Sequence, residues 1–377
     1  MPISKPELFI GLMSGTSMDG IDAALVDFSE AQPKLIATHG LVWSDDIKQA
    51  LLAAKDIPDD ELDTLNDLDL ATAETFAEAC IQLLDKSPYQ AKHITAIGNH
   101  GQTIRHRPDI TQPFSLQIGN AEKLASITGI DVISDFRTAD IKAGGQGAPL
   151  APAFHQAVFR SDDIDRTIVN IGGISNITVL PKDRTQPVTG FDCGPGNNLM
   201  DAWVSMHTGK AYDENGRLAA IGKTDMGLLA RLLLDEYFQL APPKSTGFEY
   251  FNLQWLNNHE GIETGNETII ADIQSTLCEL TATSIMRAIN QYAEDTSEIY
   301  ICGGGAHNQE LMKRIQSLTE SKVDSTAALG VHPDWVEAMA FAWLAYRHNK
   351  KLPGNLPVVT GASDDVVLGR LTNSPIK

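Results

Sequence analysis

A polar turn between two apolar stretches, at residues 14–20, constrains this chain more than any other feature. Residues 8–13 and 21–28 are rich in apolar side chains, and the segment between them reads Ser-Gly-Thr-Ser-Met-Asp-Gly. That pattern is typical of a β-hairpin with a polar tip. Glycine lets the backbone approach a bulky anion, and successive N–H groups can form an anion-binding nest. The tip is therefore a candidate phosphate loop, although an ordinary hairpin turn would have a similar composition.

Size and charge limit the possibilities further. At 377 residues the chain exceeds the usual size of one hydrophobic core, so two domains are expected. Strand-like and helix-like segments alternate, which predicts an α/β protein. The formal net charge of −20 repels nucleic acid and anionic membrane surfaces. We therefore expect small-molecule partners, with no nucleic acid and no membrane.

The sequence also predicts a cytoplasmic location. The apolar run at 8–13 is too short for a secretory signal, and no apolar stretch has transmembrane length. The cysteines lie far apart without metal-type spacing, which favours reduced thiols: Cys80, Cys193, Cys278 and Cys302.

The apolar pattern predicts a strand–turn–strand unit at the start of each half of the chain. Strands are expected at 8–13, 21–28 and 34–43, and again at 166–171 and 174–180. Phe76, Cys80 and Leu83 share one face of an amphipathic helix that ends near residue 86. A strand at 93–98 should lead into a polar loop at 99–103. Later helices are expected at 195–207, 227–238, 268–291, 308–318 and 333–347, and a strand at 298–302.

Familiar nucleotide motifs are absent from the sequence. Residues 216–224 (GRLAAIGKT) have five residues, not four, between the glycines of a P-loop pattern. Gly303 and Gly305 lack the third glycine of a dinucleotide-binding motif. Two other turns are candidates instead. Residues 170–176 (NIGGISN) place two glycines between strands, and 303–305 form a glycine turn before a helix. Taken alone, each is also compatible with a plain structural turn.

Asp192, within GFDCGPGN at 190–197, is the strongest catalytic candidate. It ends a short apolar segment, and Pro195 can occupy the first turn of a following helix. A helix N-terminus would lower the pKa of the carboxyl, whereas burial would raise it. In either case the group can accept a proton at neutral pH. A purely structural capping role is the alternative.

A second polar cluster suits a sugar. Asn99, His100, Gln102 and Thr103 offer groups for hydroxyls and an acetamide, and Arg137 suits a carboxylate. No third ligand at metal spacing accompanies His100 and His106, so zinc is not indicated. Glu337 interrupts an apolar helical stretch (WVEAM), where it is either a solvated residue or part of the site.

Together these segments resemble the anhydro-N-acetylmuramic acid kinase family of the actin/hexokinase/Hsp70-like ATPase superfamily. The matching blocks follow the family's order and span nearly the whole chain, which is more specific than any one glycine pattern. They are 11–22 (GLMSGTSMDGID), 98–106 (GNHGQTIRH), 134–137 (SDFR), 144–149 (GGQGAP), 170–176, 190–197 and 301–306 (ICGGGA).

The resemblance implies a two-domain α/β fold of the actin/hexokinase-like ATPase type, with duplicated ribonuclease H-like domains and a central cleft. Residues 1–142 plus 348–377 would form the first domain, with the first phosphate loop and the sugar-binding loops. Residues 143–347 would form the second domain, with the second phosphate loop, the catalytic Asp and the adenosine loop.

The resemblance also implies an activity. The enzyme would use ATP to open 1,6-anhydro-N-acetylmuramic acid with water and phosphorylate O6, giving N-acetylmuramic acid 6-phosphate and ADP in peptidoglycan recycling. The implied catalytic residues are Asp192, as general base, and Glu337. The implied sugar-binding residues are Asn99, His100, Gln102, Thr103 and Arg137. The implied ATP-binding residues are Gly15, Thr16, Ser17, Met18, Asp19, Gly20, Ile21, Asp22, Asn170, Gly172, Gly173, Asn176, Gly194, Gly303, Gly304 and Gly305.

Mg²⁺ is the expected cofactor, with its direct protein ligands left open. Many superfamily members carry an Asp on the first strand, but here that strand reads Ile-Gly-Leu-Met at 10–13, and Asp19 and Asp22 are candidates to substitute for it. Cys193 stands where a small hydroxyl residue is more usual. A homodimer is expected. The alternatives are another sugar kinase of the superfamily and a nucleotide-switched protein that binds a partner.

Overall fold

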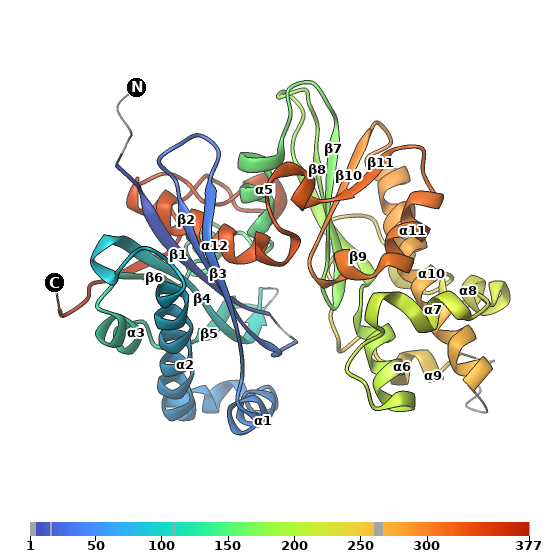
Figure 1. Ribbon diagram of the computed structural model, residues 1–377, viewed down its shortest axis with the longest axis horizontal. Coiled ribbons are helices and arrows are strands. Elements are labelled where there is room, and N and C mark those ends of the chain that lie inside the picture. The colour runs from blue at the N-terminus through green and yellow to red at the C-terminus, as the bar shows by residue number, and fades with distance from the viewer. Residues whose placement is uncertain (1–4, 16, 109, 260–266, 377) are drawn as a thin grey trace. The chain divides into compact units, whose positions relative to one another are not determined.

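The computed structural model describes residues 5–15, 17–108, 110–259 and 267–376, which form two compact units (Figure 1). Unit 1 comprises Met1–Phe154 and Trp335–Lys377, and unit 2 comprises His155–Asp334. The division falls inside helix α5 (Ala151–Phe159). None of the helices in the described residues combines the length and apolar composition that a membrane span needs.

Unit 1 is built on a mixed sheet with the strand order β12-β6-β4-β1-β2-β3, and β5 pairs with β4. The first three strands are antiparallel, whereas β4 runs parallel to β1 and β6 runs parallel to β4. The strands are β1 (Leu8–Ser14), β2 (Gly20–Asp27), β3 (Lys34–Val42), β4 (Ile94–Arg107), β5 (Phe114–Ile118), β6 (Val132–Ser134) and β12 (Arg370–Thr372). The helices are α1 (Asp45–Ala54), α2 (Asn66–Asp85), α3 (Ala121–Thr128), α4 (Thr138–Lys142), α12 (Val336–Asn349) and α13 (Pro357–Thr360).

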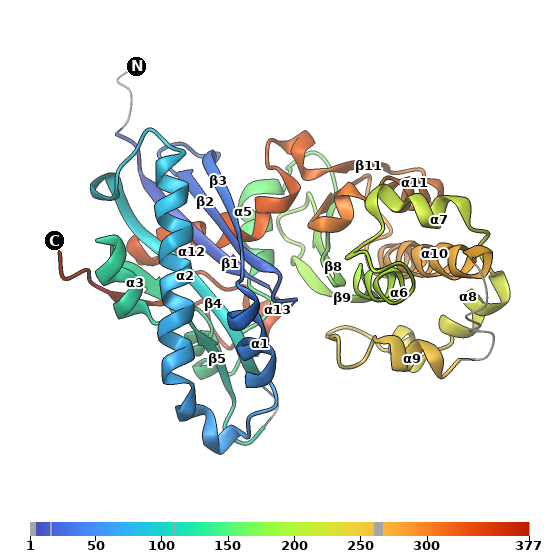
Figure 2. The same cartoon turned by 60° about the horizontal axis from the view of Figure 1, so that its bottom comes forward.

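Alternation along β1 explains how two helices cover this sheet. Leu8, Ile10 and Leu12 join the buried cluster that contains the apolar face of α2. The intervening residues face the other way, where Phe9 packs edge-to-face on Tyr346 of α12. Figure 2 shows α2 crossing one face of the sheet, with α12 behind it. A strand buried on both faces is apolar along most of its length, as β1 is from Leu8 to Met13.

Unit 2 repeats this topology with the order β11-β10-β7-β8-β9. An antiparallel trio comes first, and β10 then pairs parallel with β7 and β11 with β10. The strands are β7 (Arg166–Ile171), β8 (Ile174–Leu180), β9 (Thr189–Pro195), β10 (Glu298–Cys302) and β11 (Lys322–Ser325). The helices are α6 (Asn198–Thr208), α7 (Arg217–Ile221), α8 (Met226–Leu232), α9 (Leu253–Asn257), α10 (Glu267–Tyr292) and α11 (Gln309–Ser317).

The predicted α/β class and the duplication are confirmed by these matching strand orders. Five core strands of each unit follow the same spatial order, which is 3-2-1-4-5 when they are numbered along the chain. In unit 1 they are β3-β2-β1-β4-β6, and in unit 2 they are β9-β8-β7-β10-β11. The predicted strands at 166–171, 174–180 and 298–302 are confirmed to the residue.

Two local predictions were wrong. Residues 99–103 are not a loop, because β4 continues to Arg107 and pairs with β5 along its second half. Pro195 does not begin a helix but ends β9, and α6 begins at Asn198. In both places a neighbouring strand supplies hydrogen-bond partners that the local sequence does not reveal.

Candidate functional site

Ser14 and Gln102 hydrogen-bond to the backbone of the first hairpin turn, between β1 and β2. The Ser14 hydroxyl lies 2.8 Å from the Gly20 carbonyl oxygen and 2.7 Å from Gln102 Oε1, and donates its one hydrogen to one of them at a time. Trp43 Nε1 donates to Ser14 Oγ at 3.2 Å, and Gln102 Nε2 donates to the Gly15 carbonyl at 3.2 Å. Gln102, a predicted sugar ligand, is buried under the turn and braces it.

The tip of this turn is anchored by Met18. Met18 is fully buried, with a left-handed φ of 55°, and its N–H donates to the Gly15 carbonyl at 3.2 Å. Asp19 is exposed and pairs with Lys48 at 3.2 Å. Thr16 lies outside the described residues. The other predicted nucleotide residues of this hairpin lie at its tip or on β2: Ser17, Gly20, Ile21 and Asp22.

The polar residues of β4 are hydrogen-bonded within unit 1. Asn99 Nδ2 donates to the Gly119 carbonyl at 3.1 Å, and Asn99 Oδ1 accepts the Gly101 N–H at 3.1 Å. Thr103 Oγ1 accepts from Gln117 Nε2 at 3.2 Å. These bonds use only part of the hydrogen-bonding capacity of the Asn99 and Thr103 side chains. The sugar-binding roles of both residues therefore stay predictions.

His100, Arg137 and Glu337 interact in unit 1, where His100 is buried and the other two side chains are half-buried. His100 Nε2 lies 2.8 Å from Arg137 Nη2. Burial, and then the Arg137 charge, lowers the pKa of His100 to about 3, so the imidazole is neutral. A guanidinium only donates, so Nε2 accepts and Nδ1 carries the proton. Burial lowers the pKa of Arg137 to about 10 and raises that of Glu337, while the attraction between the two opposes both shifts.

Arg137 retains binding capacity. Its Nη1 donates to the Gly147 carbonyl at 2.8 Å, but its buried Nε has no hydrogen-bond acceptor among the described residues. A buried charged donor without a partner is costly. A carboxylate would satisfy such a donor, and the role of Arg137 as partner of a sugar carboxylate stays a prediction.

Asp140 supports Arg137 through Gly147. This wholly buried carboxylate accepts the Gly147 N–H at 2.8 Å, and it also accepts Asn355 Nδ2 at 2.8 Å and Thr360 Oγ1 at 2.7 Å. The sequence reasoning missed Asp140. An acidic residue three positions after Arg137 and close to a run of glycines was the available signal.

The second hairpin turn, Gly172–Gly173 between β7 and β8, is tied to the segment after β9. The Gly196 N–H donates to the Gly173 carbonyl and the Asn197 N–H to the Gly172 carbonyl, both at 2.8 Å. Gly173 does not need a left-handed φ. A Cβ there would overlap the Phe248 ring, which would have to move to make room for a side chain.

The structure brings other predicted nucleotide residues of unit 2 together. Asn170 lies opposite Cys302 in the β7–β10 pair, and its side chain lies against Gly303. Gly303 has a left-handed φ of 77°, which glycine tolerates. The turn Gly303–Gly305 therefore lies beside the second hairpin rather than apart from it. Asn176 faces both Asn170 and Asp192 across neighbouring strands, and Gly194 lies two residues after Asp192.

Asp192 lies in the middle of β9. Its Oδ2 accepts the Thr246 N–H at 3.0 Å, and its own N–H donates to the Lys244 carbonyl at 3.2 Å. Burial raises the pKa of the carboxyl to about 6, while the Thr246 N–H and the Lys244 charge act in the opposite direction. No helix N-terminus lies at Asp192, so burial decides the direction of the shift. Near neutral pH the group is a mostly ionised base of useful strength.

The model of the anhydro-N-acetylmuramic acid kinase family matches residues 7–374 of this chain. The chain belongs to this family. It is 51% identical over 362 residues to the anhydro-N-acetylmuramic acid kinase of Shewanella sp. (strain ANA-3), covering 96% of this chain and 97% of that protein. It is 46% identical over 366 residues to that of Coxiella burnetii (strain RSA 493 / Nine Mile phase I), with 97% of each chain covered. Among solved structures, the (R)-2-hydroxyglutaryl-CoA dehydratase component A of Acidaminococcus fermentans is 11% identical, with a TM-score of 0.49 over 92% of this chain and 100% of that one.

In this anhydro-N-acetylmuramic acid kinase family member, a further segment contacts the candidate site. The sequence alone did not identify it. Residues 242–251 (PPKSTGFEYF) bring Lys244 and Thr246 to Asp192, and Phe248 to Gly173. The available signal was a Lys-Ser-Thr-Gly cluster after two prolines, which is too short and irregular to stand out in a single sequence.

No group of three or more His, Cys, Asp or Glu side chains among the described residues could hold a metal ion. Mg²⁺ in kinases usually takes only one or two carboxylates and completes its shell with phosphates and water. The first hairpin carries two acidic residues, Asp19 and Asp22, of which Asp19 pairs with Lys48.

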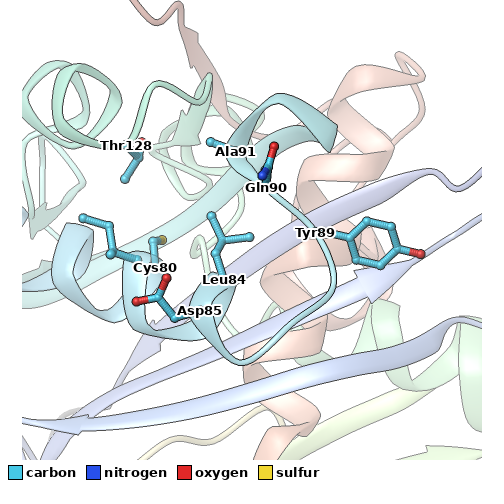
Figure 3. Close-up of a pocket in the computed structure, with 8 residues that line it drawn as sticks. Cys80, Leu84, Asp85, Tyr89, Gln90, Ala91 and Thr128 are labelled. Carbon is cyan, nitrogen blue, oxygen red and sulfur yellow. The ribbon is translucent and has the colours of Figure 1, made fainter.

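A cavity of about 220 Å³ in unit 1 has none of these residues in its lining (Figure 3). It is lined by Cys80, Ile81, Leu84, Asp85, Tyr89, Gln90, Ala91 and Thr128. Burial raises the pKa of the Cys80 thiol well above its usual range, so the thiol is not a nucleophile. This cavity has no part in the candidate site.

Proposed function

We propose that this chain is an ATP-dependent kinase that opens 1,6-anhydro-N-acetylmuramic acid with water and phosphorylates O6, giving N-acetylmuramic acid 6-phosphate and ADP. Its family and its relatives' names support the activity. The observation that carries the chemistry is Asp192, a carboxyl of raised pKa held through one oxygen by Thr246. Within the described residues no hydrogen-bond donor reaches Oδ1, which leaves that oxygen for a water molecule.

In the proposed reaction, Asp192 takes a proton from water as the water oxygen bonds to C1. The bond between C1 and O6 breaks, and O6 bonds to the γ-phosphorus while the bond from that phosphorus to ADP breaks. Each bond made is matched by one broken, and the proton stays on Asp192 until product leaves.

The remaining roles follow from charge and position. We assign the sugar carboxylate to Arg137, and a second proton-handling role to Glu337, whose pKa burial raises. We assign the nucleotide to the two hairpin turns and to Gly303–Gly305. Bound Mg²⁺ would neutralise charge on the phosphates, and Asp19 and Asp22 are the carboxylates that the first hairpin offers it. A cytoplasmic location, a homodimer and a role in peptidoglycan recycling stay predictions.

The test measures ADP release with anhydro and reducing forms of N-acetylmuramic acid and N-acetylglucosamine. We expect turnover with the anhydro muramic sugar alone. In ¹⁸O-water the label should enter the product at C1 and not the transferred phosphate. Label in inorganic phosphate beside an unphosphorylated sugar would overturn the coupled reaction, and turnover of the reducing sugars would indicate an ordinary sugar kinase.

A further inference from the structure

Residues 242–251 form a strap that contacts β9 at Asp192. Lys244 is the basic residue of this strap. The backbone of Lys244 accepts the Asp192 N–H at 3.2 Å, and two residues later the Thr246 N–H donates to Asp192 Oδ2 at 3.0 Å. The strap is therefore paired with the backbone of Asp192 and also bonded to its carboxyl. This double attachment holds Lys244 close to Asp192.

The Lys244 ammonium is held in place on Tyr237, in the short 3₁₀ helix Glu236–Gln239. Its Nζ donates to the Tyr237 carbonyl at 3.2 Å and lies 4.7 Å from the centre of the Tyr237 ring. The Tyr237 hydroxyl in turn donates to the Asp192 carbonyl at 2.8 Å. Among the described residues, the partners given for the ammonium are the carbonyl and the ring of Tyr237, and neither is an anion. Lys244 is thus fixed beside Asp192 without being neutralised in a salt bridge.

The other titratable groups that face Asp192 carry no charge at neutral pH. Burial raises the pKa values of the Cys193 thiol and the Tyr237 phenol well above their usual range, and Asp192 adds to both shifts. Within the described part of unit 2, the cation acting on Asp192 is Lys244, and burial lowers its own pKa.

We propose that Lys244 is a positioning residue that keeps the Asp192 carboxyl ionised at neutral pH, so that it can accept the proton of the attacking water. That water is the proton donor rests on the proposed function, whereas the effect of Lys244 on the Asp192 carboxyl does not. Lys244 keeps its own proton during the reaction. The proton moves only from water to Asp192.

The test separates the charge of Lys244 from its hydrogen bond. Lys244→Gln keeps a donor for the Tyr237 carbonyl and removes the charge, Lys244→Arg keeps the charge, and Lys210→Met removes an exposed charge elsewhere in unit 2. Two measurements are made on the whole enzyme. One is the pH profile of kcat/KM. The other is the titration of the Asp192 carboxyl by ¹³C NMR, assigned with Asp192→Asn.

We expect Lys244→Gln to raise the Asp192 pKa, and to move the acid limb of the profile to higher pH with it, because the Lys244 charge acts to lower that pKa. Lys244→Arg and Lys210→Met should leave both unchanged. An unmoved Asp192 titration in folded Lys244→Gln would overturn the proposal, as would equal shifts in the Gln and Arg variants. If Lys244→Gln does not fold, Lys244→Met decides by the same titration. A shifted titration in an enzyme that ignores the anhydro sugar would reject the proposed function and leave this inference standing.

Discussion

Asp192 is the residue on which the proposed chemistry depends most. Asp192→Asn should lower kcat by roughly 100- to 10,000-fold, the usual contribution of a general base. The amide oxygen can still accept the Thr246 N–H, so the fold and ATP affinity should persist. Steady-state kinetics with calorimetric ATP titration measures this. Asp295→Asn, which alters an exposed carboxylate of unit 2, is the control. Activity within about tenfold of the parent enzyme would remove Asp192 from the mechanism.

Gly173 lies against the ring of Phe248. A Cβ at this position would overlap the ring of Phe248, so Gly173→Ala should displace residues 242–251 and weaken ATP binding at the second hairpin. Phe248→Ala in the same chain should restore much of that affinity by making room. The control is Gly40→Ala on β3, outside the assigned nucleotide residues, where the nearest atom to an added Cβ lies 3.8 Å away. Failure of Phe248→Ala to rescue would show that the glycine serves another purpose.

At the scale of elements, α12 depends on two glycines that face each other in the sheet. Gly11 of β1 pairs with Gly98 of β4, and a Cβ on either would overlap the backbone of α12, at Ala338 or Phe341. Backbone cannot move aside as a side chain can, so the helix would have to shift. These glycines therefore set how closely α12, which carries Glu337 in its first turn, lies on the sheet.

Gly98→Ala should accordingly destabilise the protein. Overpacking of this kind costs about 1–3 kcal/mol, which corresponds to a fall in Tm of roughly 2–12 °C for a unit of this size. KM for the sugar should rise with the displacement of Glu337. Thermal unfolding and kinetics measure both effects. Gly40→Ala on β3 is the control, because an added Cβ there lies 3.8 Å from its nearest neighbours. Equal Tm values for the two variants would contradict this account.

For the whole molecule, the net charge of −20 opposes the approach of anionic ligands. Salt screens such repulsion, since the Debye length falls to about 10 Å at 0.1 M. The association rate of an anionic nucleotide analogue should therefore rise, by up to roughly tenfold, between low and moderate ionic strength. Stopped-flow fluorescence at fixed Mg²⁺ measures it. A rate that falls with salt would show that local cations outweigh the overall charge.

Much of the fold was readable from the sequence, because its signals are local. Short apolar runs next to glycine turns marked β7, β8 and β10 to the residue, and helical spacing marked α2. The repeated strand–turn–strand pattern indicated two related halves. The family blocks also marked the turns, Asp192 and Arg137 as candidates before any geometry was known. These features depend on residues only a few positions apart.

Tertiary structure decided the rest, because the deciding contacts join residues far apart in the chain. β4 continues through polar residues because β5 pairs with it and Asn99 bonds to Gly119. Asp192 owes its raised pKa to burial in β9 rather than to a helix end. Lys244 came to Asp192 only when a distant segment folded beside β9, and Asp140 gained Asn355 and Thr360 as partners in the same way. The sequence determined which groups were available, while burial and long-range hydrogen bonds decided their charge and their partners.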